Sequence, residues 1–216
     1  MDPFHLCIAL GPVGVYLLLI GLLNLSTTPF VTNGARDLMV LAIAISGFAI
    51  VGPMELFMPE PSANYFRGWI WLPLIALYFL VALLVSMIAR PRIVIYNVTV
   101  DQLRSVLGEA ANDLDVDSRW AGESLTLPNL GVQLFIQGYP GLRNVQLVAA
   151  GGEQNLNSWK RLETVLSQSL KSIEVGRNPR GFSAISVAIV MFLAIVYSLI
   201  YGQESIADRM QEFFRF

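Results

Sequence analysis

Two ionisable side chains, His5 and Glu55, stand in apolar stretches long enough to cross a bilayer. Inserting a charged carboxylate costs about 2.5–3.5 kcal/mol at the bilayer centre and less near the bilayer surface. A glutamate in such a stretch is therefore a candidate functional residue. Histidine titrates near neutral pH, so the pair could form an outward-facing proton or cation site. The alternatives are that Glu55 reaches water at the outer boundary and that His5 is an interfacial side chain.

Helix-breaking residues occur at similar depths in three of the apolar stretches. Gly11 and Pro12 interrupt the first, Gly52 and Pro53 interrupt the second, and Pro73 lies one turn into the third. A proline deprives the carbonyl four residues earlier of its helical partner, and lipid offers no replacement. Three breaks at one depth could enclose a small wet cavity, as broken helices do in transporters. The alternative is that these prolines are kinks that help the helices to pack.

The scarcity of cysteine and histidine excludes several kinds of metal and catalytic site. Cys7 is the only cysteine and His5 is the only histidine of the 216 residues. The sequence therefore predicts no intramolecular disulfide, no bis-histidine haem and no zinc site of the Cys and His type. A Ser/His/Asp or Cys/His nucleophile outside the first apolar stretch has no histidine available. We expect no cofactor, no bound metal and no enzymatic activity.

Three alternate aspartates, Asp113, Asp115 and Asp117, resemble the opening of a calcium loop. That loop requires glycine at its sixth place and glutamate at its twelfth, where this sequence has Ser118 and Leu125. The prediction is therefore a solvated acidic turn.

A pair of glycines, Gly151 and Gly152, precedes a predicted helix and could admit an anion at the helix start. No Gly-Lys-Ser/Thr follows, so the segment is not a P-loop. A plain turn is the simpler prediction.

The elements that must position these residues follow from the hydrophobic pattern. The chain is 55% hydrophobic and 14% charged, whereas a soluble domain carries about 25% charged residues. We predict an integral membrane protein with four transmembrane helices, at about 4–25, 38–58, 69–89 and 179–202. Residues 203–216 are expected to form an amphipathic tail on the membrane surface.

A soluble α+β domain is predicted over residues 90–178, inserted between the third and fourth transmembrane helices. Its pattern is β-α-β-β-β-α, with strands at 92–98 and within 120–127, 132–137 and 144–149, a helix opened by a Thr99–Gln102 capping box, and a helix containing Trp159. The economical packing is a four-stranded, largely antiparallel sheet with two helices on one face. Trp120 and Trp159 are expected in its core, and residues 26–37 are expected to be a polar loop.

Lys and Arg near the ends of the spans predict the orientation. The richer set comprises Arg36, Arg90, Arg92, Arg104, Lys171, Arg177 and Arg180, and the poorer set comprises Arg67, Arg209 and Arg215. The domain should therefore be cytoplasmic and both termini outside, in the cytoplasmic (inner) membrane of a bacterial cell.

The functional hypothesis follows from what is absent. A net charge of −2 and the lack of a basic stripe argue against nucleic acid as a partner. We predict a non-enzymatic membrane protein, a sensor, scaffold or complex subunit, whose cytoplasmic α+β domain binds a partner protein or small ligand. The expected partners are the lipid bilayer and either other membrane-protein subunits or further copies of the chain. The alternative is a small oligomeric transporter or channel component with an outer-leaflet polar site near Glu55.

Overall fold

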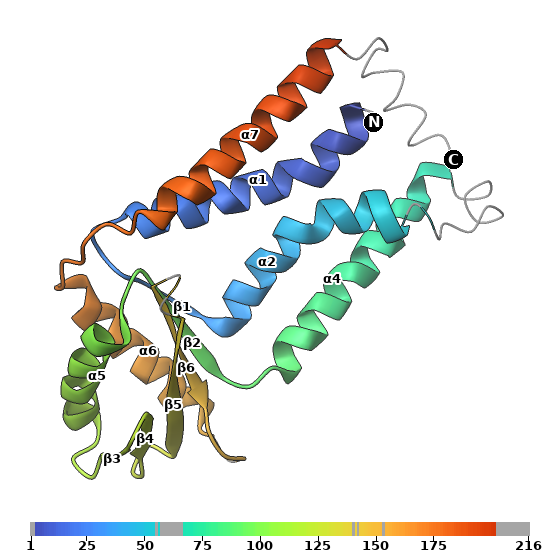
Figure 1. The fold of residues 1–216 in the computed structure, drawn as a ribbon. Helices are drawn as coiled ribbons and strands as arrows, with labels where there is room; N and C mark the ends of the chain where they lie inside the picture. Colours follow the sequence, from blue (N-terminus) through green and yellow to red (C-terminus); the bar gives the residue numbers. More distant parts are fainter. Residues whose placement is uncertain are drawn as a thin grey trace. The chain divides into compact units, whose positions relative to one another are not determined.

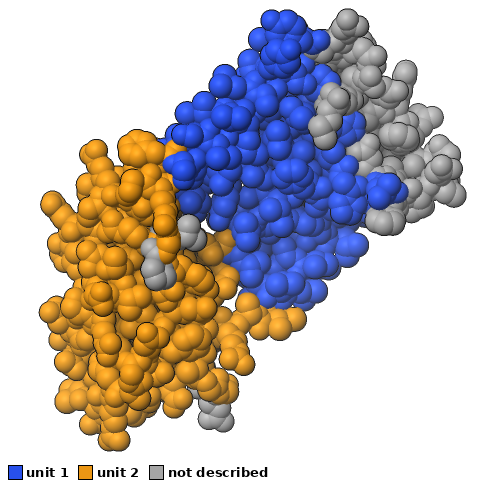
Figure 2. All heavy atoms as spheres, in the orientation of Figure 1, with its two compact units in different colours: residues 1–20, 38–87, 183–216 blue, residues 21–37, 88–182 orange. Residues whose placement is uncertain are grey.

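The computed structural model describes residues 3–54, 56, 67–139, 141, 143–152 and 154–201. Contacts divide the chain into two compact units (Figure 2). The helical unit comprises residues 1–20, 38–87 and 183–216, and the α+β unit comprises residues 21–37 and 88–182. Both Glu55 and the predicted tail at 203–216 lie outside the described residues.

Among the described residues, four helices are long and apolar enough to cross a membrane, as predicted (Figure 1). They are α1 (Pro3–Leu25), α2 (Gly34–Ala49) together with the π-helical segment η1 (Ile50–Met54), α4 (Trp71–Ile88) and α7 (Arg180–Tyr201). A short 3-10 helix, η2 (Arg67–Ile70), directly precedes α4. The second of the four long helices begins at Gly34 rather than near residue 38. Asn33 caps it, because its side-chain oxygen accepts a hydrogen bond of 2.9 Å from the backbone N–H of Ala35.

Small residues allow close packing inside the helical unit. A Cβ atom on Gly47 of α2 would collide with the backbone carbonyl oxygen of Ile8 in α1. A Cβ on Gly14 of α1 would lie 3.1 Å from the ring of Phe192 in α7. The Gly47 contact belongs to the class in which glycine lets helix backbones approach closely, whereas Gly14 makes room for an aromatic ring.

In the described part of the α+β unit, one antiparallel sheet of six strands forms the centre, in the order β1-β2-β6-β5-β4-β3. The strands are β1 (Phe30–Asn33), β2 (Arg92–Tyr96), β3 (Arg119–Ala121), β4 (Ser124–Leu127), β5 (Val132–Tyr139) and β6 (Asn144–Ala149). The prediction of four strands was therefore wrong, although the mixed α+β class and the antiparallel pairing are confirmed.

The two additional strands have separate origins. Gly122, with φ +63°, turns the chain between β3 and β4, so that the single strand predicted over 120–127 becomes a hairpin. The strand β1 lies in the segment that was predicted to be a polar loop. It pairs with β2 in antiparallel register, Phe30 opposite Tyr96 and Asn33 opposite Ile93.

Helices α5 (Val100–Leu114) and α6 (Leu156–Lys171) pack on one face of this sheet (Figure 1). The Thr99–Gln102 capping box that opens α5 is present as predicted. Alternate strand residues, including Ile95, Leu134 and Leu147, meet the apolar sides of both helices in one core. The helices contribute Leu107, Leu162 and Leu166 to it. Strand residues of the other parity therefore project from the opposite face of the sheet.

The two predicted core tryptophans differ in burial. Trp159 of α6 is 5% exposed and belongs to the core, which confirms the prediction. Trp120 is only half-buried and packs against the edge of the core, because β3 is the last strand of the sheet. The guanidinium of Arg104 lies 5.3 Å from the centre of the Trp120 ring, in cation–π geometry.

Candidate functional site

The described intramembrane candidates are distributed over three helices. His5 is half-buried in the first turn of α1, where its ring meets that of Phe4 edge-on with centroids 6.3 Å apart. Gly11 and Pro12 lie in the interior of α1, which continues through them to Leu25. Glu55, the proposed partner of His5, is outside the described residues, so the pair remains a prediction.

The second helix changes its winding at the predicted break. Gly52 and Pro53 lie in the π-helical segment Ile50–Met54 that follows α2. Such segments are uncommon and are frequent at functional sites. Pro73 is the third residue of α4, where a missing backbone N–H costs no helical hydrogen bond. Within the described part of the chain, no group of three or more His, Cys, Asp or Glu could hold a metal ion.

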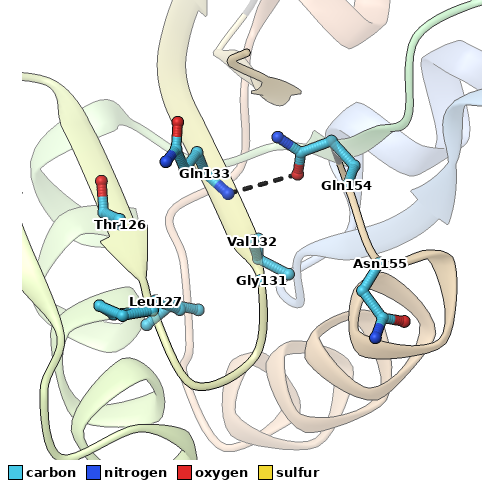
Figure 3. A pocket seen from close by; sticks show the side chains of 8 residues that line it. Thr126, Leu127, Gly131, Val132, Gln133, Gln154 and Asn155 are labelled. Atoms are coloured by element: carbon cyan, nitrogen blue, oxygen red, sulfur yellow. Dashed lines mark hydrogen bonds between the residues drawn. The ribbon is translucent and has the colours of Figure 1, made fainter. Parts of the chain in front are cut away.

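A groove of about 550 Å³ lies in the α+β unit beside the turn that joins β4 to β5 (Figure 3). Its lining includes Thr126, Pro128, Gly131, Gln133, Gln154 and Asn155. Here it is named the glutamine groove. Thr126 and Gln133 are directly opposite each other in the β4–β5 ladder. Their side chains therefore project together from the face opposite α5 and α6, as Figure 3 shows.

Gln154 forms a fixed wall of the glutamine groove. Its side-chain oxygen accepts hydrogen bonds from the backbone N–H of Gln133 at 3.3 Å and from the indole N–H of Trp159 at 2.9 Å. Its amide nitrogen donates to the carbonyl of Ala150. With both ends of the amide occupied, Gln154 shapes the groove instead of adapting to a ligand.

The neighbouring groups complete this wall. The side-chain oxygen of Asn155 caps α6, accepting hydrogen bonds from the N–H groups of Asn157 and Ser158. Gly151, with φ +85°, leaves room for the side chain of Gln133, since a Cβ there would lie 3.1 Å from the Gln133 amide oxygen. Gly151 and Gly152 form a bend, in agreement with the predicted turn.

Thr126 and Gln133 supply the groups that a ligand can use. In the described residues, neither side chain takes part in an internal hydrogen bond. A carboxamide offers two donors and one acceptor oxygen, and a hydroxyl offers both functions. The arrangement is suited to a small uncharged group with its own donors and acceptors.

Asp115 holds the turn that borders the glutamine groove. Its carboxylate accepts hydrogen bonds from the backbone and side chain of Asn129, at 2.8 and 2.7 Å, and from the backbone of Asp117 at 3.0 Å. The predicted solvated turn is thus partly wrong: Asp113 and Asp117 are exposed, but Asp115 is only 3% exposed. The carboxylate can be buried because it accepts hydrogen bonds from the N–H groups of this turn, which would otherwise bond to water.

Burial by itself would raise the pKa of the Asp115 carboxyl group. The hydrogen bonds from Asp117, from the side chain and backbone of Asn129 and from the backbone of Leu130 outweigh that effect and lower the pKa below its ordinary value. Asp115 is therefore a charged structural acceptor at neutral pH.

Sequence reasoning did not find Thr126, Gln133 or Gln154. Glutamine and threonine on the polar side of a strand are ordinary surface residues, and their spacing in the sequence does not predict a groove. The one local signal was Asn155 at the start of a helical pattern, which marks an N-cap and not a site.

Comparisons with protein-family models, with curated proteins and with solved structures find no match to this chain.

Proposed function

We propose that this chain is a membrane-anchored binding protein whose α+β unit takes a small uncharged ligand, or a polar segment of a partner protein, in the glutamine groove. The observation that carries the proposal is the cross-strand pair Thr126 and Gln133, which presents hydrogen-bonding groups beside the immobile Gln154. A prepared wall with a few polar groups is the usual form of a small-ligand site.

The lining chemistry favours binding over catalysis. Besides Thr126, Gln133, Gln154 and Asn155, the groove is lined by Leu127, Pro128, Gly131 and Val132. None of these described residues is ionisable near neutral pH, so the groove offers no group for general acid–base chemistry.

Hydrogen bonds join the sheet to the ends of the first two long helices. Inside the α+β unit, the side chain of Asn97 after β2 donates a 2.7 Å hydrogen bond to the carbonyl of Ser26, just after α1. The hydroxyl of Tyr96 donates to Asp37 in the first turn of α2. These bonds fix the sheet to the helix ends within the α+β unit.

Ligand-observed NMR of the full-length protein in detergent tests the proposal. The probes are a panel of small amides, polyols, carboxylates and phosphates. Gln133→Trp should fill the groove and abolish binding of uncharged amides or polyols. Gln137→Trp is the matched control, because Gln137 is exposed on the same strand and the same face but does not line the groove. Hits that persist in Gln133→Trp, or an absence of uncharged hits, would contradict the proposal.

The π-helical segment at Gly52 and Pro53 favours a second candidate function. Here the chain is a small oligomeric transporter or channel component that uses a polar site near Glu55, since interrupted helices are a feature of transporter binding sites. Proton or cation flux into liposomes containing the purified protein tests it. Flux that Glu55→Gln abolishes supports this function, and liposomes that remain tight exclude it.

A further inference from the structure

A second groove of the α+β unit, of about 500 Å³, lies among β1, the first turn of α2 and α6. Three cations line it, Arg36, Lys160 and Lys171, together with one carboxylate, Glu163. It is here named the basic groove. Its ionisable side chains carry a net charge of +2 at neutral pH, in a chain whose net charge is −2. The positive charge is therefore a local feature.

The pairing of β1 with the sheet creates this groove. On α6, Lys160, Glu163 and Lys171 recur at spacings of three and eight residues, which places them on one side of the helix. Arg36 comes from a segment more than a hundred residues earlier. It reaches α6 only because β1 adds to the sheet edge, where Asn33 donates a 3.5 Å hydrogen bond to the Glu163 carboxylate.

The cations are not neutralised internally. Across the described ranges, none of Arg36, Lys160 and Lys171 forms an ion pair. The hydroxyl group of Ser167 also lines the groove, whereas that of Thr164 donates a 2.9 Å hydrogen bond to the Lys160 carbonyl. Guanidinium, ammonium and hydroxyl donors together form the usual set for a phosphate oxygen, and arginine fits it bidentately.

The position of Arg36 in its helix points to the source of the phosphate. Arg36 lies in the first turn of α2, a candidate membrane span, and the apolar stretch begins two residues later at Leu38. At a rise of 1.5 Å per residue, that separation is about 3 Å along the helix. A basic pocket at the end of a span is the recognised setting for acidic lipid headgroups.

We propose that the basic groove binds a phosphate group, supplied by an anionic phospholipid headgroup or by a soluble phosphate. The site is separate from the glutamine groove and independent of the function proposed for it. Binding is electrostatic and thus weakens with added salt. The Glu163 carboxylate repels a phosphate group, so the affinity depends on the balance between the three cations and this one anion.

The test measures the affinity of the full-length protein in neutral detergent for three probes: short-chain phosphatidylglycerol, short-chain phosphatidylcholine and inorganic phosphate. Phosphatidylglycerol should bind more tightly than phosphatidylcholine. Lys160→Gln with Lys171→Gln should weaken it at least tenfold. The matched control, Arg119→Gln with Arg161→Gln, removes the same charge from exposed positions that do not line the groove, and should change the affinity less than twofold.

A further variant separates binding from folding. Glu163→Gln removes the opposing carboxylate and should tighten phosphatidylglycerol binding severalfold, which a damaged fold cannot produce. Inorganic phosphate that binds as tightly as the lipid, with the same response to the variants, supports the phosphate site and assigns a soluble ligand. Equal binding of both lipids, or equal losses in the control pair, overturns the proposal in favour of diffuse surface charge.

Discussion

Asn24 and Asn178 are hydrogen-bonded to each other through both side chain and backbone, although 154 residues separate them. The side-chain amide of Asn178 donates to that of Asn24 at 3.2 Å, and the backbone N–H of Asn178 donates to the Asn24 carbonyl at 2.9 Å. Both are buried: Asn24 is 7% exposed and Asn178 is 3% exposed. The pair joins the last turn of α1 to the residues that precede α7.

Asn178→Ala should therefore destabilise the protein. The substitution leaves the Asn24 amide buried without this partner, which costs about 1–3 kcal/mol. Thermal unfolding of the full-length protein in detergent measures the effect. Asn157→Ala is the control, since Asn157 is exposed on α6 and should leave the melting temperature unchanged. Equal melting temperatures for the two variants would show that the asparagine pair contributes nothing.

The edge strand β1 can be tested with neighbouring residues that face opposite sides of the sheet. Val31 packs against the core, whereas Thr32 projects from the other face. Val31→Asp should lower the free energy of unfolding by about 1–3 kcal/mol, because it brings a charge to the core side. Thr32→Asp should cost clearly less in the same denaturation measurement. A larger loss in Thr32→Asp would mean that β1 has the opposite facing.

Much of the fold was predictable, and β1 shows where prediction stopped. The four long helices follow from hydropathy, and α5 follows from its periodicity and the Thr99–Gln102 capping box. In β1, the four residues Phe-Val-Thr-Asn are too few for a reliable alternating pattern. They form a strand because β2, more than fifty residues away, offers an unpaired edge. Such long-range pairing leaves little local signal.

The groove residues were unpredictable for the same reason. Thr126, Gln133 and Gln154 acquire a role only when β4, β5 and the segment before α6 meet. The sequence instead indicates His5 and Glu55 as candidate site residues, because ionisable groups are rare in apolar stretches.

Close packing of α1 against α2 predicts different outcomes for two helical glycines. Gly47→Ala should destabilise the protein by about 1–3 kcal/mol, because the new methyl group would collide with the Ile8 carbonyl and force the helices apart. Gly11→Ala is the control, since nothing lies within 4 Å of the position its Cβ would take. Thermal unfolding in detergent compares them. A Gly47→Ala variant as stable as Gly11→Ala would contradict the packing.

The lowered pKa of Asp115 predicts how stability depends on pH. Because its folded pKa lies below the ordinary value of 3.8, the charged carboxylate stabilises the fold above that pH, and the contribution is lost as pH falls through the folded pKa. Asp115→Asn should therefore lower the melting temperature at pH 7, and the gap to the parent protein should narrow below pH 4. Exposed Asp113→Asn should match the parent throughout. A gap that stays constant down to pH 3 would argue against this role.

The glutamine groove as a binding site is tested most directly by protection of a cysteine placed inside it. In a Cys7→Ser background, which leaves no other thiol, Pro128→Cys and Gln137→Cys are each treated with N-ethylmaleimide, with and without the tightest uncharged amide or polyol from the NMR panel. Pro128 lines the groove and is exposed, and its replacement leaves Thr126 and Gln133 in place. We expect this probe to slow labelling at position 128 at least fivefold and to leave labelling at position 137 unchanged. Equal labelling rates at position 128 with and without the probe would contradict the glutamine groove as a binding site.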